Sequence, residues 1–179
     1  MIEKHGAVEV ERCFRFDERF DDCWEELRCA RSNVLMGVRT QETLNWHFKY
    51  ALLNQHVWIL TATYQSRLIG YSVFYREDTP QFGLTRVRLA DFQTLQGSYS
   101  LLYSMIGWAL QECRKQGIHM LETVGLGPEK MELITKLGPR RRKFHSWLSF
   151  YKTGDRYLAE SLKNSGVWDL SCFDGDSSL

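Results

Sequence analysis

Residues 84–125 constrain the fold of this 179-residue chain more than any other stretch. Their pattern predicts a β-strand over 84–92, a polar turn at Gln96-Gly97-Ser98, a long amphipathic helix that ends at Gly117, and a second strand over 118–124. Backbone amides at a helix start point outward without partners. A turn between a strand and a helix is therefore a ready site for a phosphate group.

The rest of the chain continues in the same alternating way. The pattern predicts strands over 8–16, 56–64, 68–75, 144–151 and 168–173, and helices after Asp17, Thr40, Gly127 and Asp155. The three residues between 64 and 68 indicate a tight hairpin, and the nearly continuous apolar run of 118–124 favours a central strand. The order β-α-α-β-β-β-α-β-α-β-α-β predicts an α/β fold in which helices cover both faces of a mixed sheet.

Length and composition favour one globular domain spanning residues 1–179. A formal net charge of +1 gives no general attraction to nucleic acid or to an anionic membrane. The longest apolar stretch, 101–110, is interrupted by Ser104 and Gly107 and is too short to span a bilayer. No apolar run follows a basic start, so we expect no secretory signal and a cytoplasmic location.

Three further features have two readings each. The five cysteines lack the close spacing of a zinc or redox motif. They are either all inert thiols, or one of them is a nucleophile. The cysteines are Cys13, Cys23, Cys29, Cys113 and Cys172. The basic run 140–143 is a solvated strand edge or a phosphate contact. Asp174-Gly175-Asp176 is a solvated tail or a metal site, and we expect no metal.

Two short motifs accompany this element order. Leu68-Ile69-Gly70-Tyr71 opens the strand after the hairpin, and Lys136-Leu137-Gly138 ends the helix after the strand at 118–124. With these motifs the chain resembles the GNAT superfamily of acyl-CoA-dependent N-acyltransferases. The resemblance covers nearly the whole chain as architecture and is concentrated between residues 68 and 138 as motif. The helix at 155–164 departs from the simple closing hairpin that is common in the family.

The resemblance implies a coenzyme A loop between the strand at 84–92 and the following helix. The family pattern is Gln/Arg-x-x-Gly-x-Gly/Ala, whose amides receive the pyrophosphate and whose small residues let the backbone approach closely. A register that begins at Gln93 puts Gln96 at the first glycine and Ser98 at the small position. A register that begins at Gln96 keeps Gly97 but puts Tyr99 where a small residue belongs. We prefer the first register; the implied acetyl-CoA (acyl-CoA) contacts are Gln93, Gln96, Gly97, Ser98 and Tyr99.

Many family members carry a tyrosine on the helix after the fifth strand that protonates the departing coenzyme A thiolate. Alignment on Lys136-Leu137-Gly138 puts Ile134 at that tyrosine. The expected acid is therefore absent. Catalysis would need another donor or would release the thiolate directly to water.

Amine acylation also requires a neutral amine, because an alkyl ammonium has a pKa of about 10. Asp91, near the end of the strand that enters the loop, is a candidate base or a turn or cap residue. Glu122 lies among apolar residues and is a base or a buried structural anchor. Alternation over 144–151 puts His145 and Tyr151 on one face, as proton carriers in an acceptor cleft or as parts of a solvent-facing strand.

These observations support an N-acyltransferase that moves an acetyl or other acyl group from acyl-CoA to an amine on a small molecule. The alternative, motivated by the missing tyrosine and the altered loop, is a catalytically silent module of the same fold with a binding or regulatory role.

Overall fold

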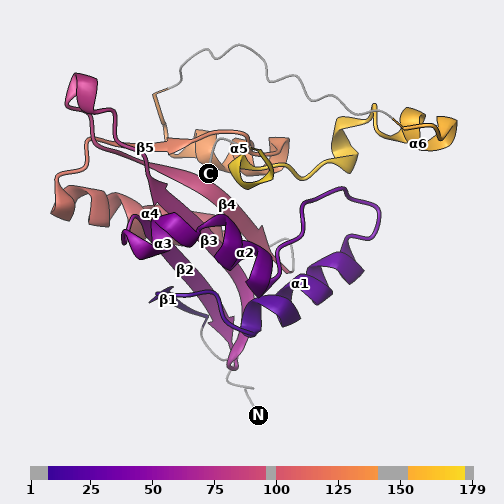
Figure 1. Cartoon of the computed structure of the whole chain (residues 1–179), viewed down its shortest axis with the longest axis horizontal. Coiled ribbons are helices and arrows are strands. Elements are labelled where there is room, and N and C mark those ends of the chain that lie inside the picture. Colours follow the sequence, from indigo (N-terminus) through magenta and orange to yellow (C-terminus); the bar gives the residue numbers. More distant parts are fainter. Residues whose placement is uncertain (1–7, 96–99, 141–152, 176–179) are drawn as a thin grey trace.

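The computed structural model describes residues 8–95, 100–140 and 153–175, and it contains a five-stranded mixed sheet of order β1-β2-β3-β4-β5 (Figure 1). The strands are β1 (Glu9–Cys13), β2 (Val57–Tyr64), β3 (Arg67–Arg76), β4 (Arg86–Thr94) and β5 (Met120–Thr123). Neighbouring strands are antiparallel from β1 to β4, whereas β5 is parallel to β4. The predicted hairpin joins β2 to β3, and Gln65 and Ser66 at its tip both have positive φ angles, which match the twist of the flanking strands.

Helices cover both faces of this sheet, as predicted. The helices are α1 (Arg19–Ala30), α2 (Gln41–His47), α3 (Lys49–Leu53), α4 (Ser100–Gln116), α5 (Pro128–Lys136) and α6 (Arg156–Ser161), with short 3₁₀ turns η1 (Pro80–Phe82), η2 (Ser165–Val167) and η3 (Cys172–Asp174). Side chains of α1 and α2 pack on the face that carries Ile59 and Val73, whereas α4 and α5 pack on the face that carries Leu60 and Phe74. The two cores therefore follow the period of two along β2 and β3.

Local signals account for several helix ends. The Thr40 hydroxyl accepts a hydrogen bond from the amide of Thr43 and caps α2, and Asp155 caps α6 in the same way. Gly117 and Gly138 follow α4 and α5 with φ angles of 66° each, a conformation that glycine adopts at little cost.

A β-bulge interrupts β4 at Ala90. Val73 of β3 pairs with Asp91, but the next residue, Phe74, pairs with Leu89. Ala90 is therefore an extra residue, and both Ala90 and Asp91 face α1 and α2 while Leu89 and Phe92 face α4. Simple alternation would send Asp91 to the α4 face, so the bulge decides which partners it meets.

The pairing between β4 and β5 ends early. The last paired residues are Leu89 and Thr123, so β4 continues for five residues, 90–94, without a strand beside it on the β5 side in the described part of the chain. This stretch of β4 is a free edge in the sense that no described strand pairs with it on that side.

The structure corrects the strand predicted at 168–173, and another predicted strand lies outside the described residues. Residues 168–173 form no strand: Trp168 makes one isolated bridge with Leu35, and η3 follows, because polar side chains rather than a backbone ladder fix this segment. β5 is the last strand of the sheet formed by the described residues, and the central place predicted for 118–124 stays a prediction. The strand predicted at 144–151 falls in the part of the chain that the structure does not describe.

The N-terminal strand is shorter than predicted, and Leu137, predicted on the buried face of α5, is 45% exposed. Among the described residues no helix combines the length and the apolar character that a bilayer crossing requires.

Candidate functional site

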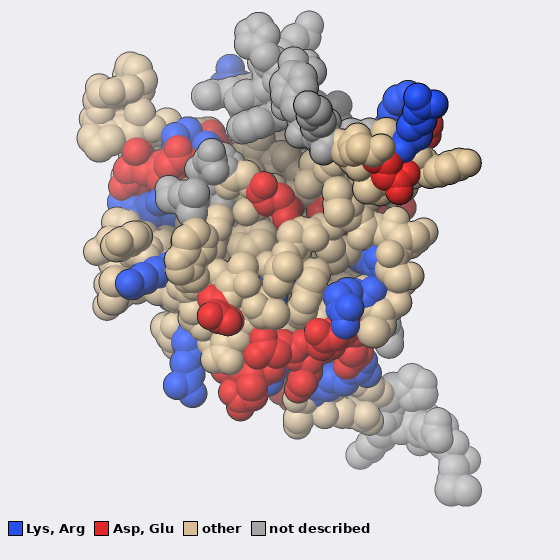
Figure 2. Space-filling view, turned by 45° about the vertical axis from the view of Figure 1, so that its right-hand side comes forward, with Lys and Arg blue, Asp and Glu red and all other residues tan. Residues whose placement is uncertain are grey.

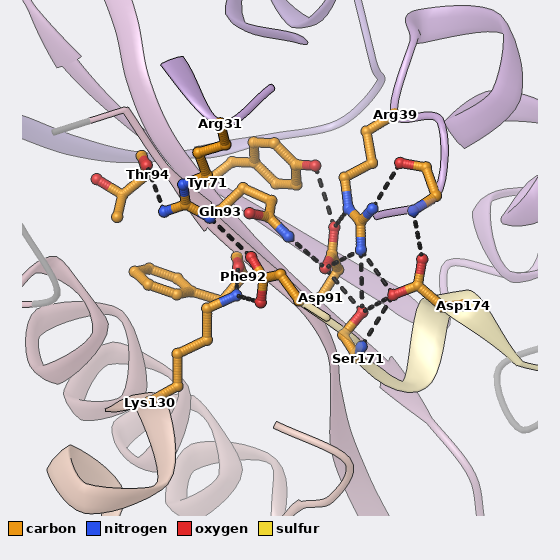
Figure 3. Close-up of polar contacts among 12 residues, drawn as sticks. Arg31, Arg39, Tyr71, Asp91, Phe92, Gln93, Thr94, Lys130, Ser171 and Asp174 are labelled. Carbon is orange, nitrogen blue, oxygen red and sulfur yellow. Dashed lines mark hydrogen bonds and ion pairs between the residues drawn. The ribbon is translucent and has the colours of Figure 1, made fainter. Parts of the chain in front are cut away.

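Asp91 is fully buried, and both of its carboxylate oxygens accept hydrogen bonds (Figure 3). Arg39, just before α2, donates from Nε to Oδ2 at 2.8 Å and from Nη2 to Oδ1 at 3.2 Å. The Tyr71 hydroxyl donates to Oδ2 at 3.0 Å, and the Ser171 hydroxyl donates to Oδ1 at 2.9 Å. Asp91 lies inside β4, so it is neither a turn nor a cap residue.

Arg39 also holds the C-terminal segment, residues 168–175, in place. Arg39 donates from Nη2 to Asp174 Oδ2 at 2.8 Å and from Nη1 to the carbonyl oxygen of Gly37 at 2.6 Å. The amide of Gly37 donates back to Asp174 Oδ1 at 3.0 Å. Asp174 is therefore held against the α1–α2 connection, and the prediction of a solvated tail is wrong for this residue; Asp176 lies outside the described residues.

The charges in this network support one another. Burial raises the pKa of Asp91, but the positive charge and hydrogen bonds of Arg39 outweigh burial and leave that pKa below its usual value. Burial likewise lowers the pKa of Arg39, yet the charge of Asp91 more than compensates and raises it overall. Both groups are therefore charged near neutral pH, and these contacts suit a structural anchor. Whether Asp91 also acts as a base stays a prediction.

A second cluster lies along the free edge of β4. Lys130 of α5 is 2% exposed, and its Nζ donates to the Phe92 carbonyl oxygen at 2.9 Å and to Asp169 Oδ1 at 2.8 Å. Arg31, at the end of α1, donates to Asp169 Oδ2 at 2.7 Å and reaches the Thr94 carbonyl oxygen at 3.4 Å. Phe92 and Thr94 are two residues apart, so their carbonyls point to the same side of the strand.

This cluster was not predicted from the sequence. Lys130 is a single lysine in an ordinary helix pattern, and its partner Asp169 lies 39 residues further on. Burial lowers the pKa of Lys130, whereas the charges of Asp169 and Asp91 raise it; burial dominates and the pKa falls below its usual value.

Glu122 has the partners that its position among apolar residues requires. Its Oε2 accepts hydrogen bonds from Arg88 at 3.1 Å and from Arg86 at 3.5 Å, and its side chain is 12% exposed. Tyr75 donates to Glu77 and accepts from Arg88 at the same end of β4. Glu122 and Asp91 thus lie in separate networks, and the choice between base and anchor stays open for Glu122.

Of the predicted coenzyme contacts, the structure describes Gln93 alone. Its side chain is fully buried, and its Nε2 donates to Asp91 Oδ1 at 3.4 Å, while its Oε1 has no hydrogen-bond partner. Gln93 therefore points toward the Asp91 network in this structure. The other predicted site residues, Gln96, Gly97, Ser98, Tyr99, His145 and Tyr151, lie outside the described residues. No group of three or more His, Cys, Asp or Glu side chains suited to a metal ion occurs among residues 8–95, 100–140 and 153–175.

Comparison with known proteins places the fold. No protein-family model matches the sequence, and no curated protein matches it. Several solved structures match the fold of this chain. A predicted acetyltransferase with acetyl-CoA from Clostridium acetobutylicum has a TM-score of 0.59 at 14% identity, over 81% of this chain and 96% of that chain. Glucosamine-6-phosphate N-acetyltransferase from Arabidopsis thaliana has a TM-score of 0.59 at 10% identity, over 81% and 99%. A transcriptional regulator from Bacillus halodurans has a TM-score of 0.60 at 14% identity, over 80% and 100%.

The predicted fold is thus confirmed: a mixed sheet with helices on both faces, arranged as in GNAT acetyltransferases. At these identities the likeness concerns the fold.

Proposed function

We propose that this chain, which has the GNAT fold, is an N-acyltransferase that moves an acetyl or other acyl group from acyl-CoA to an amine of a small molecule. The fold likeness to an acetyltransferase with acetyl-CoA and to a sugar-phosphate N-acetyltransferase supports this reaction class. We propose a cytoplasmic location, where the thiols of the chain would stay reduced.

The observation that carries the proposal is the free edge of β4 beside the start of α4. The connection between Leu95 and Ser100 is where the sequence predicts the pyrophosphate. The pantetheine arm that extends from the pyrophosphate contains two amide groups. Such an arm pairs with backbone groups of a strand edge in the way that an added strand does. At this edge it would have to lie beside Lys130 and Arg31, which donate to the carbonyl oxygens of Phe92 and Thr94. An arm that ran back along β4 would bring the thioester to the region of Phe92, beyond the end of the β4–β5 pairing.

The acceptor must lose a proton before it attacks. We propose Glu122 and Asp91 as the candidate bases, with His145 and Tyr151 as proton carriers on the acceptor side. Glu122 is the more solvent-accessible of the two carboxylates, because Asp91 is fully buried. Asp91 would need a chain of water molecules to take a proton from an amine. The proposal also requires a backbone N–H, for which we choose one at the β4 bulge, to meet the developing oxyanion.

The charge distribution favours a small acceptor. On the face drawn in Figure 2, Lys and Arg side chains lie in separate places with Asp and Glu between them. A nucleic-acid site requires a continuous basic stripe or patch, which this face does not display. The proposal includes neither a nucleic acid nor a membrane as partner, in keeping with the formal net charge of +1.

The alternative is a catalytically silent module that binds coenzyme or another ligand for a regulatory purpose. Two observations favour it: Ile134 is buried where the family tyrosine is expected, and one solved structure of similar fold is described as a transcriptional regulator. The two proposals differ in turnover and not in coenzyme binding.

Thermal unfolding with and without acetyl-CoA tests the coenzyme site. A ligand at one hundred times its dissociation constant adds about 2.7 kcal/mol of stability, and ATP serves as a control for unspecific phosphate binding. No shift at millimolar acetyl-CoA contradicts both the enzyme and the coenzyme-binding module. If a shift appears, release of free thiol in the presence of an amine panel identifies the enzyme, and its absence across the panel identifies the silent module.

Two variants test the proposed bases. Glu122→Gln and Asp91→Asn are each expected to lower turnover more than they weaken coenzyme affinity. Unchanged turnover in a variant that remains folded removes that residue from the proposed chemistry.

A further inference from the structure

We propose that Lys130 is the acid that protonates the departing coenzyme A thiolate, and that it replaces the tyrosine absent at position 134. This assignment rests on the proposed function and adds a catalytic residue to it.

The position of Lys130 on α5 is the first argument. Lys130 and Ile134 are four residues apart, which is about one helical turn, so their side chains lie on the same face of the helix. Both are buried, and α5 begins at Pro128, so Lys130 lies in its first turn. Position 134 lacks a proton donor, and Lys130 supplies one from the same face of α5 one turn earlier.

The reach of the side chain is the second argument. Figure 3 shows Lys130 extending from α5 to β4, where its Nζ lies 2.9 Å from the Phe92 carbonyl oxygen. Phe92 belongs to the free edge of β4, three residues beyond the last pair with β5. Leu95, the last described residue before the predicted pyrophosphate site, is three residues further on, about 10 Å of extended strand. The ammonium group therefore stands beside the path proposed for the acyl arm.

The surroundings hold the ammonium group in place. Asp169 accepts from Nζ at 2.8 Å, and the other oxygen of Asp169 is held by Arg31, so the carboxylate cannot rotate away freely. Asp169 and the more distant Asp91 favour the protonated form, whereas Arg39 and burial disfavour it. Because burial dominates, the pKa of Lys130 lies below its usual value, so the ammonium group gives up its proton more readily than an exposed lysine does.

The step balances without a further reactant. The neutral amine attacks the thioester carbonyl carbon, a C–N bond forms and the C–S bond breaks with its electron pair on sulfur. Lys130 gives one proton from Nζ to sulfur, which yields the free thiol. The proton lost by the amine passes to the base or to water, and Lys130 regains its proton from solvent.

Tyr103 is the rival donor among the described residues near α5. Its hydroxyl donates to the Leu133 carbonyl oxygen at 3.1 Å and lies on α4, close to position 134. Tyr71 is a weaker candidate, because it faces α1 and donates to Asp91 on the opposite side of the sheet. Lys130 is preferred to Tyr103 because its Nζ reaches the edge of β4 itself.

The ionisation of bound coenzyme A tests the assignment without any acceptor. A positive charge within about 4–6 Å lowers the pKa of an acid by about one to three units, and thiolate formation is followed by its ultraviolet absorbance. We expect bound coenzyme A to ionise at least tenfold more readily than free coenzyme A at a given pH. Lys130→Met should abolish this difference. Lys136→Met, a change at an exposed lysine on the same helix, should leave it unchanged.

The outcomes are distinct. If coenzyme A does not bind, the proposed function and the assignment both fail. If it binds and Lys130→Met leaves thiol ionisation unchanged, the assignment alone fails. If Tyr103→Phe and not Lys130→Met changes the ionisation, Tyr103 is the donor.

Turnover measurements distinguish proton donation by Lys130 from the effect of its positive charge alone. Lys130→Arg keeps a cation but, with a pKa above 12, gives up no proton, so it should preserve thiolate stabilisation yet lower kcat for acetyl-CoA. An aryl thioester, whose thiolate leaves without protonation, should restore much of that loss. Full kcat with acetyl-CoA in Lys130→Arg overturns the proposal, and circular dichroism checks that each variant is folded.

Discussion

The buried pair of Arg39 and Asp91 gives the sharpest stability prediction. Asp91→Asn removes the negative charge while it preserves the shape of the side chain. Arg39 would then keep Asp174 and the Gly37 carbonyl as partners but lose its main counter-charge inside the protein. Asp91 is fully buried, so no water replaces the lost interaction.

The magnitude follows from the environment of the pair. Removing one partner of a buried ion pair costs about 3–5 kcal/mol, because the remaining charge is left without compensation. Asp174 supplies part of that compensation, so we expect the lower end, about 3 kcal/mol. For a chain of this length 1 kcal/mol corresponds to roughly 2–4 °C in Tm, so the midpoint should fall by roughly 6–12 °C.

Urea unfolding followed by circular dichroism measures the change, with Glu122→Gln as the matched control. Glu122 is also paired with arginine, but its partners Arg86 and Arg88 both keep Glu77, so its loss should cost about 1 kcal/mol. The reasoning is refuted if Asp91→Asn destabilises no more than Glu122→Gln. A cycle with Arg39→Met adds an internal check, since the double variant should lose less than the sum of the single losses.

Three further predictions concern two glycines, two cysteines and the acid stability of the Asp91 network. Gly37→Ala should lower the free energy of unfolding by about 1–3 kcal/mol, because an added Cβ would clash with the Oδ1 atom of Asp174. Gly107→Ala, inside α4 with nothing near the added Cβ, should raise it by about 0.5–1 kcal/mol; thermal shifts of the same sign in both variants would contradict this. In native protein at pH 8 the exposed Cys29 should react with a thiol reagent, whereas Cys23, whose pKa burial raises to about 12, should react after unfolding alone; peptide mapping that finds equal labelling would refute it. Folding lowers the pKa of Asp91, so its contribution to the free energy of unfolding is complete above the unfolded pKa of about 3.9 and is lost as the pH falls through the folded pKa. Between about pH 5 and pH 2 the wild type should therefore lose more stability than Asp91→Asn. Parallel curves of stability against pH for the two proteins would exclude this linkage.

The periodic part of the fold follows from the sequence because it depends on neighbours in the chain. Apolar spacing predicts α1 and α4, and the Thr40 cap and the Gly117 stop set helix ends through contacts within a few residues. The three residues between the strands predicted at 56–64 and 68–75 leave a hairpin as the compact solution, and β2 and β3 form it. Each of these signals acts over a short distance.

The partners of Asp91 could not be predicted in the same way. The bulge at Ala90 shifts the side-chain alternation of β4 by one residue, and nothing in the local pattern marks it. Arg39 and Ser171 are 52 and 80 residues away in the chain. From the sequence alone, a polar residue in a strand is therefore equally compatible with a buried hydrogen-bond network and with a catalytic group. The choice depends on partners that only the fold reveals.

The buried face of α5 shows a similar limit. The apolar spacing of Met131, Ile134 and Leu137 predicts the inner face, but Lys130 is buried and Leu137 is largely exposed. A buried lysine breaks the usual pattern of the helix and is tolerated because Asp169 accepts its hydrogen bond.

The C-terminal segment connects the two polar networks. Asp169 pairs with Lys130 and Arg31 at the free edge of β4, and Asp174 pairs with Arg39 on the α1–α2 side of the sheet. Removing the segment would leave Lys130 and Arg31 without their carboxylate partner and Arg39 with Asp91 but without Asp174, and an unpaired buried charge such as that of Lys130 costs several kcal/mol. Displacement by a ligand is therefore unfavourable. An acyl arm along β4 has to fit beside the segment, with Asp169 still holding the ammonium group of Lys130 toward the edge of the strand.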